Sequence, residues 1–244
     1  MKSKKPSFTF VFTIMCLVII LLVTGALSFV SVINIRNISR TQIEAEVKGS
    51  ITYMNSKIDD IISSHVALLE HTVVGAIPYM REEIVDRDTL SHYFDMMQAT
   101  LANVLMIYCT NNVRWNGPDG YCASSTGWIP ADTWNNLERS WYQDAKKAQG
   151  KVAFTAPYID AATGKLIIAM ARTVYDEDGT TDLGVVSENV TIASLGGILT
   201  ENTALQAQET YLITKDGLFM TNNDESAVMK KDFFTEMGLE RYRG

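Results

Sequence analysis

A long uncharged stretch near the start of the chain, from Pro6 to Ile35, limits what this protein can fold into. A helix needs about 20 apolar residues to cross the hydrocarbon core of a bilayer, so this stretch suffices for one span. Three lysines precede it, and the cytoplasmic flanks of spanning helices favour positive charge. We expect residues 1–7 to be a cytoplasmic tail and residues 8–32 to be a transmembrane helix in the plasma (inner) membrane. The rest of this single-pass chain is expected to lie outside the cytoplasm.

A cleaved signal peptide is the competing interpretation, because the small residues Ala26 and Ser28 resemble a cleavage region. The apolar core of a signal peptide usually has about 7–15 residues, so the length of the stretch favours an uncleaved anchor. The charges agree: the net charge of the chain is −7, and the residues after the stretch carry −10 because lysines precede it. Such an acidic ectodomain argues against nucleic acid as a partner, which requires a basic face.

Apolar residues then recur mostly every three or four positions, which predicts a long stalk helix over residues 33–77. Pro78 is expected to end this helix. The apolar stripe needs a partner, so we expect part of it to pack on the chain's own domain and part to form a homodimer with a second copy.

The region 78–205 is predicted to be one α+β module. A helix capped by Asp88 is expected from Thr89 to Asn103, and strand-like segments rich in β-branched residues follow it. Helices that precede a strand-rich core indicate an α+β fold with an antiparallel sheet. Residues 206–244 begin with a strand–turn–strand pattern and are too few to hold a core alone, so we expect the truncated start of a second module.

Two cysteines of the expected exported part, Cys109 and Cys122, follow a strand and a turn-rich loop respectively. Their compartment and even number predict a disulfide, and two free, half-buried thiols are the alternative. The three histidines, His65, His71 and His92, all lie in the expected early helices, and no catalytic or metal-binding spacing includes them. We therefore expect no enzyme activity, no cofactor and no metal ion.

A cluster of aromatic, cationic and acidic residues marks the candidate functional site. Arginine offers a planar fork of donors to a carboxylate, and aromatic faces together with an acid attract an ammonium group. The cluster therefore suits a small zwitterion. Taken singly, each member has an ordinary structural role as a surface cation, a core aromatic or the cap of a turn. The cluster consists of Trp134, Arg139, Trp141, Tyr142, Tyr158 and Asp160.

In their order along the chain, these residues resemble the membrane-distal module of a double Cache (dCache) domain. Such domains are built from PAS-like antiparallel sheets and are the extracytoplasmic sensors of bacterial transmembrane receptors, among them methyl-accepting chemotaxis proteins. The pattern aromatic-x4-Arg-x-Trp-Tyr with a later Tyr-x-Asp is similar to the subset that binds amino acids. The segments that carry the resemblance are Gly127–Pro130, Trp134, Arg139, Trp141-Tyr142, Pro157–Asp160, Thr163–Lys165 and Gly184–Val186.

The resemblance implies a role for each member of the cluster. Arg139 and Trp141 would hold a ligand carboxylate, the ammonium would lie among Trp134, Tyr158 and Asp160, and Tyr142 would line the pocket. The subset has one more aspartate in the strand after Gly-Val-Val, and this chain has Asn189 there. Loss of that carboxylate would cost ammonium binding about 1.5–3 kcal/mol.

Glu188 replaces the missing acid only if the strand slips by one residue. The ligand is therefore expected to be an amino acid or an organic acid, bound by a sensor that signals across the membrane, with chemotaxis as the output. The ectodomain of a histidine kinase or diguanylate cyclase, or a truncated binding protein that does not signal, are the alternatives.

Overall fold

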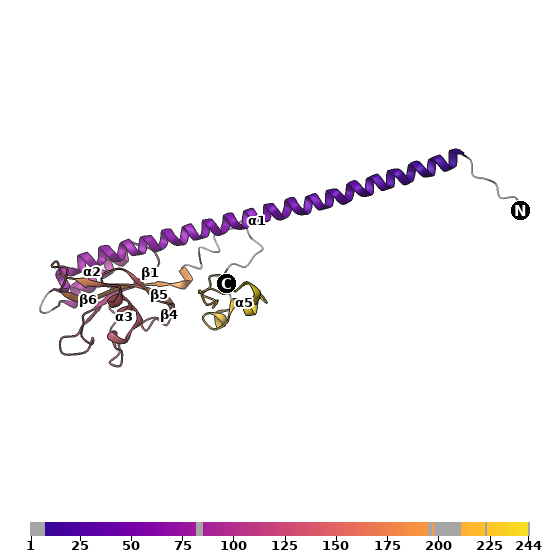
Figure 1. Ribbon diagram of the computed structural model, residues 1–244. Coiled ribbons are helices and arrows are strands. Elements are labelled where there is room, and N and C mark those ends of the chain that lie inside the picture. The colour runs from indigo at the N-terminus through magenta and orange to yellow at the C-terminus, as the bar shows by residue number, and fades with distance from the viewer. Residues whose placement is uncertain (1–7, 82–84, 195–196, 198–210, 223, 244) are drawn as a thin grey trace. The chain divides into compact units, whose positions relative to one another are not determined.

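The computed structural model describes residues 8–81, 85–194, 197, 211–222 and 224–243 (Figure 1). By its internal contacts the chain divides into two compact units, 1–53 and 54–244. The first unit contains the start of helix α1, and the second contains the rest of α1 and the whole sheet. The predicted boundary at residue 32 stays a prediction, and the one at residue 205 lies outside the described residues.

Helix α1 runs without interruption from Phe8 to Met80. Large apolar side chains between Leu17 and Ile35 are exposed, and α1 is the one described helix that is long and apolar enough to cross a membrane. The expectation that Pro78 ends the helix after residue 77 is wrong, because the helix continues through Pro78 to Met80. Pro78 lies in the last turn, where a proline removes only one backbone hydrogen bond, and Arg81 N still donates to Ile77 O at 3.1 Å.

Helix α2 spans Arg87–Gln98 and begins two residues earlier than its pattern predicts, because Asp86 rather than Asp88 caps it. Asp86 Oδ1 accepts from the backbone N–H groups of Asp88 and Thr89 at 3.1 and 3.3 Å. Asp88 instead lies in the first turn, where its negative charge favours the helix N-terminus. Of the five apolar residues expected to be buried along this helix, Leu90 and Phe94 are buried, whereas Tyr93, Met97 and Leu101 are partly buried.

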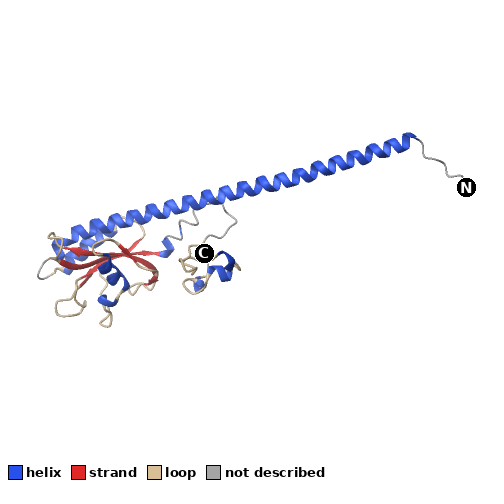
Figure 2. Ribbon diagram, viewed as in Figure 1, coloured by secondary structure: helices blue, strands red, loops and turns tan. Residues whose placement is uncertain are grey.

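An antiparallel sheet follows, so the predicted α+β class is confirmed (Figure 2). The strand order is β2-β1-β6-β5-β3, and β4 also pairs with β5. The long strands β5 and β6 are interior strands, and their segments rich in β-branched residues are strands as predicted. The strands are β1 (Val104–Thr110), β2 (Cys122–Ser124), β3 (Ala153–Phe154), β4 (Tyr158–Ile159), β5 (Leu166–Tyr175) and β6 (Asp182–Thr191).

The two faces of the sheet are covered by different layers (Figure 1). The C-terminal part of α1 and helix α2 cover one face, and their apolar side chains pack with those of the sheet around Leu69, Phe94 and Ile107. The short helix η1 (Asn136–Glu138) and helix α3 (Ser140–Ala148) cover the other face. That second layer is aromatic, and it contains Trp115, Trp134, Trp141 and Tyr142 with Tyr108 of β1.

Strand β6 contributes a polar residue to each face, because side chains alternate along a strand. Glu188 points to the α1 side, where its Oε1 contacts Nδ1 of His65, and both side chains are almost completely buried. Asn189 points to the other face. The strand register therefore excludes Glu188 as a substitute for the missing carboxylate on the aromatic side.

Residues 211–222 and 224–243 contain short elements only. An isolated antiparallel bridge joins Ile213 to Phe219 across the turn at Gly217. The predicted strand–turn–strand pattern is therefore present as a single bridge across the turn and not as two strands. A second bridge joins Leu218 to Asp232. The helices here are η3 (Glu225–Ala227), α5 (Phe233–Glu236) and η4 (Glu240–Tyr242).

The predicted disulfide between Cys109 and Cys122 is wrong, because both thiols are free and buried. In the β1–β2 ladder Cys109 lies opposite Ala123, and Cys122 lies opposite Thr110. The two cysteines are thus offset by one position and point to opposite faces of the sheet, whereas a disulfide requires their Cβ atoms to face each other.

Burial makes both thiols poor nucleophiles. It raises the pKa of Cys109 well above its ordinary value and the pKa of Cys122 to about 12. We therefore predict that a maleimide leaves both cysteines unlabelled in the folded protein at neutral pH, because the thiolate is the reactive form, and labels both after denaturation. Peptide mapping by mass spectrometry reads each site. A Thr180→Cys variant in an exposed loop confirms that the reagent is active, and a joined Cys109–Cys122 peptide would contradict the assignment.

Candidate functional site

A small pocket opens on the aromatic side of the sheet. It brings together five of the predicted ligand-binding residues: Trp134, Arg139, Trp141, Tyr158 and Asp160. Four further residues complete the lining: Met106, Tyr108, Trp128 and Ala161. The pocket therefore contains one cation, one acid and five aromatic side chains, and no other charged residue lines it among those the structure describes.

Three structural elements place these side chains. Met106 and Tyr108 alternate with residues of the opposite face along β1, so both point to the aromatic layer. Arg139 is the residue that precedes α3, with an extended backbone at φ −75° and ψ 141°, and Trp141 lies in the first turn of that helix. Strand β4 and the turn after it supply Tyr158 and Asp160.

The aromatic rings support one another. The ring of Trp134 stacks on that of Trp141 with centroids 6.4 Å apart, and it meets the ring of Trp128 edge-on at 5.4 Å. Tyr108 packs edge-on against Trp141 at 5.0 Å. Because such pairs are favourable beyond the area they bury, the rings form a preorganised wall rather than a set of loose side chains.

The start of α3 offers donors that the rest of the protein leaves free. Within the described residues, neither the Arg139 guanidinium nor the Trp141 indole N–H has a hydrogen-bond partner, and no side chain caps the helix. Arg139 is partly exposed, whereas Trp141 is buried. A guanidinium, an indole N–H and a helix N-terminus together make a site that suits an anion such as a carboxylate.

The opposite end of the pocket contains the Asp160 carboxylate, which is 5 % exposed. Its Oδ2 accepts from the backbone N–H and the hydroxyl of Thr163 at 2.9 and 2.7 Å. Its Oδ1 accepts from Nδ2 of Asn189 on β6 at 3.1 Å. Asp160 therefore has two roles, because it caps its turn and also lines the pocket.

Asn189 does not line the pocket, but it donates a hydrogen bond to Asp160, which does line it. Its Oδ1 is buried and has no partner among the described residues. An aspartate at this position would place a second carboxylate against Asp160, whereas the amide donates a hydrogen bond to it. The acidic end of the pocket thus carries a single carboxylate in a fixed orientation.

The two tyrosines of the pocket are neutral at physiological pH. Burial raises the pKa of Tyr108 well above its ordinary value, and burial raises the pKa of Tyr158 to about 12. The negative charge of Asp160 adds to the rise for Tyr158, and the hydrogen bond with Tyr108 opposes it. Both hydroxyls are therefore dipoles and not charges, and the net charge of the pocket lining depends on Arg139 and Asp160.

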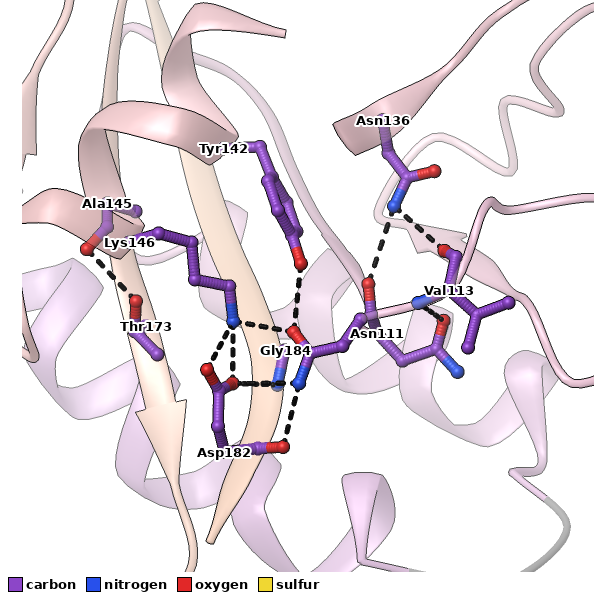
Figure 3. A network of polar contacts seen from close by, with 10 residues as sticks. Asn111, Val113, Asn136, Tyr142, Ala145, Lys146, Thr173, Asp182 and Gly184 are labelled. Carbon is purple, nitrogen blue, oxygen red and sulfur yellow. Dashed lines mark hydrogen bonds and ion pairs between the residues drawn. The ribbon is translucent and has the colours of Figure 1, made fainter. Parts of the chain in front are cut away.

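Tyr142 is not brought to the pocket, contrary to the role implied by the resemblance. Its hydroxyl donates to Oδ1 of Asn112 at 2.9 Å and belongs to a separate polar network (Figure 3). In that network Lys146 Nζ lies 2.6 Å from both carboxylate oxygens of Asp182 and 2.5 Å from Asn112 Oδ1. The side chain points away because adjacent helix residues, Trp141 and Tyr142, face different directions. Tyr142 therefore links α3 to Asn112, which follows the end of β1.

Sequence reasoning missed four lining residues. Trp128 lies in a segment already noted for the resemblance, and its aromatic character was the available signal. Met106 and Tyr108 share one face of β1 by alternation, but an apolar strand buried on both faces gives no sign of which set faces the pocket. Ala161 carries no chemical signal at all.

Comparisons with curated proteins find chemoreceptors, whereas no family model matches the chain. A probable methyl-accepting chemotaxis protein of Bacillus thuringiensis subsp. konkukian is 34 % identical over 77 residues, 29 % of this chain and 12 % of that protein. The methyl-accepting chemotaxis protein TlpB of Bacillus subtilis is 22 % identical over 201 residues, 78 % of this chain. The chain spans only 28 % of the length of TlpB.

Solved structures give the same fold. The ligand-binding domain of Mlp24 with asparagine has a TM-score of 0.64 and 20 % identity, and the match covers 82 % of this chain and 80 % of that one. The ligand-binding domain of the Pseudomonas aeruginosa amino-acid chemoreceptor PctC, in complex with GABA, has a TM-score of 0.60 and 19 % identity over 76 % and 78 % of the chains. The resemblance found in the sequence is confirmed: homologues of this chain are methyl-accepting chemotaxis proteins, and its fold is that of chemoreceptor sensor domains.

Proposed function

We propose that this chain is the sensor part of a chemotaxis receptor and that its pocket binds a small molecule with a carboxylate and a cationic group, such as an amino acid. The observation that carries the proposal is the pairing of an unpartnered guanidinium, Arg139, with the Asp160 carboxylate in one aromatic pocket. Related chemoreceptors favour chemotaxis as the output over a kinase or cyclase.

A ligand with both charges suits this pocket better than a plain organic acid. Asp160 is buried, and a ligand without a positive group would bring a second negative charge into the same small space. Like charges in a shared site are unfavourable, and Arg139 alone would have to balance both. A cationic group near Asp160 is in addition attracted by the faces of the surrounding rings.

Signalling would proceed by population shift. A ligand that binds one arrangement of the sheet and α1 more tightly than another moves the equilibrium by its difference in affinity. The apolar segment of α1 would carry that change through the membrane, with the N-terminus in the cytoplasm and the sheet outside it. The stalk part of α1 would pair with a second copy.

Arg139→Ala should weaken binding of a carboxylate ligand by at least about 2 kcal/mol, or about 30-fold, because a buried carboxylate would lose a charged donor. Isothermal titration calorimetry with L-alanine, asparagine and GABA as probes measures the change. Lys147→Ala is the matched control, since Lys147 is an exposed cation on the same helix and does not line the pocket. Equal affinities of parent and Arg139→Ala for every probe that binds would reject the assignment of the pocket.

Asn189→Asp should shift selectivity toward ligands with an ammonium group. The substitution replaces the hydrogen bond to Asp160 with a second carboxylate, so the empty domain should lose stability, and a cationic group that neutralises both acids should gain affinity. Thermal unfolding measures the first effect, and competition between an amino acid and the matching amine-free acid measures the second. An unchanged ratio of the two affinities would contradict the placement of the ammonium group beside Asp160.

The proposed orientation predicts where a C-terminal fusion is active. A reporter fused after Gly244 should work only if it is a type that functions outside the cytoplasm, because three lysines precede the single apolar span. A pair of reporters, one active on each side of the membrane, tests this directly. Activity of the cytoplasmic reporter alone would reverse the orientation.

A further inference from the structure

A buried histidine–glutamate contact on the side of the sheet away from the pocket joins α1 to β6. His65 of α1 is 2 % exposed and Glu188 of β6 is 0 % exposed, and Nδ1 of the histidine contacts Oε1 of the glutamate. Glu188 Oε2 has no hydrogen-bond partner among the described residues. The proposed ligand site uses neither residue.

Among the described residues, His65 is the side chain whose polar contact with Glu188 is observed. The cross-strand neighbours of Glu188 are Ile107 on β1 and Met170 on β5, both apolar. His65 is the titratable group that acts on Glu188 among the described residues of the packed elements. Burial of an acid in such surroundings is unfavourable unless its partner stays in place, so the pair ties β6 to one position along α1.

The position of β6 matters because the next residue along the strand reaches the pocket. Glu188 and Asn189 are consecutive, so their side chains point to opposite faces of the same strand. Asn189 Nδ2 donates to Asp160 Oδ1 at 3.1 Å, and Asp160 lines the pocket. A continuous series of contacts therefore runs from α1 through His65, Glu188, Asn189 and Asp160 to the pocket.

We propose that His65 and Glu188 are a positioning pair, which fixes β6 against α1 and thereby sets where Asn189 holds the Asp160 carboxylate in the pocket. The pair touches no ligand and acts through Asn189. Its meaning for signalling rests on the function proposed above, because a ligand that moves Asp160 would then move β6 relative to α1. The positioning itself can be tested without any ligand.

The tryptophans of the chain provide a selective readout. All four, Trp115, Trp128, Trp134 and Trp141, pack in the aromatic layer, on the face of the sheet away from Glu188. Intrinsic fluorescence of the full chain in a lipid nanodisc therefore reports on the pocket side alone.

Burial raises the pKa of Glu188 above its ordinary 4.5, while contact with His65 opposes the rise, so the proton binds at a pH above 4.5.

The experiment is a pH titration of tryptophan emission in the native state. We expect the parent to show a transition that is lost in Glu188→Gln, whose side chain has nearly the same shape and no charge. The matched control Glu70→Gln removes an exposed glutamate from α1 and should titrate like the parent. Circular dichroism at each pH establishes that every variant is folded.

His65→Gln gives a second, independent measurement if Glu188→Gln does not fold. The histidine lowers the pKa of Glu188 by its hydrogen bond and its charge, so without it the midpoint of the emission transition should move to higher pH. A pair with only a structural role would change stability and leave the emission titration as it is. Superimposable titrations of the parent and a folded Glu188→Gln or His65→Gln variant would therefore overturn the proposal, and they would leave the proposed ligand site untouched.

Discussion

The buried contact between His65 and Glu188 joins the helix layer to the sheet at one defined point. Apolar packing between α1 and the sheet is non-directional, and by itself it tolerates small shifts along the helix. A buried polar contact does not, because removing one partner leaves the other buried without a hydrogen-bond partner, at a cost of about 1–3 kcal/mol. Replacing such a contact with apolar residues of similar size is often neutral or stabilising, so the proposed role of the pair is to define register rather than to add stability.

The sheet separates two layers of different chemistry, and β6 carries buried polar residues on both faces. On the α1 side, Leu69, Phe94 and their neighbours form an apolar core beside the His65–Glu188 contact. On the other side, Asn189 holds an acid beneath a wall of tryptophans. A strand in the middle of a sheet cannot slip by one residue without exchanging these two environments, so the register of β6 protects the pocket and the helix contact together.

The fold was predictable where one physical signal dominated. Long apolar or β-branched runs gave α1, β1, β5 and β6 almost to their ends. Errors arose where two local solutions compete. Asp86 and Asp88 are both residues of a type that caps helices, and in the structure Asp86 is the N-cap of α2. The pairing of Cys109 with Cys122 failed because strand register, which the sequence does not encode locally, points the two side chains to opposite faces.

The candidate site was predictable to the extent that its chemistry is unusual. A cation and an acid beside several aromatic residues are conspicuous in any sequence, and five such predicted residues meet in one pocket. Tyr142 is aromatic like its neighbour Trp141, so the sequence does not distinguish them. Tyr142 does not line the pocket because its side chain points in a different direction from α3. The direction of the side chain also explains the role of Asn189. From the sequence, Asn189 is a position that lacks a carboxylate, whereas in the structure its amide donates a hydrogen bond to Asp160, which lines the pocket. Because that hydrogen bond occupies one acceptor site of the carboxylate, a cationic group of the proposed ligand would rely on the remaining charge and on the surrounding rings.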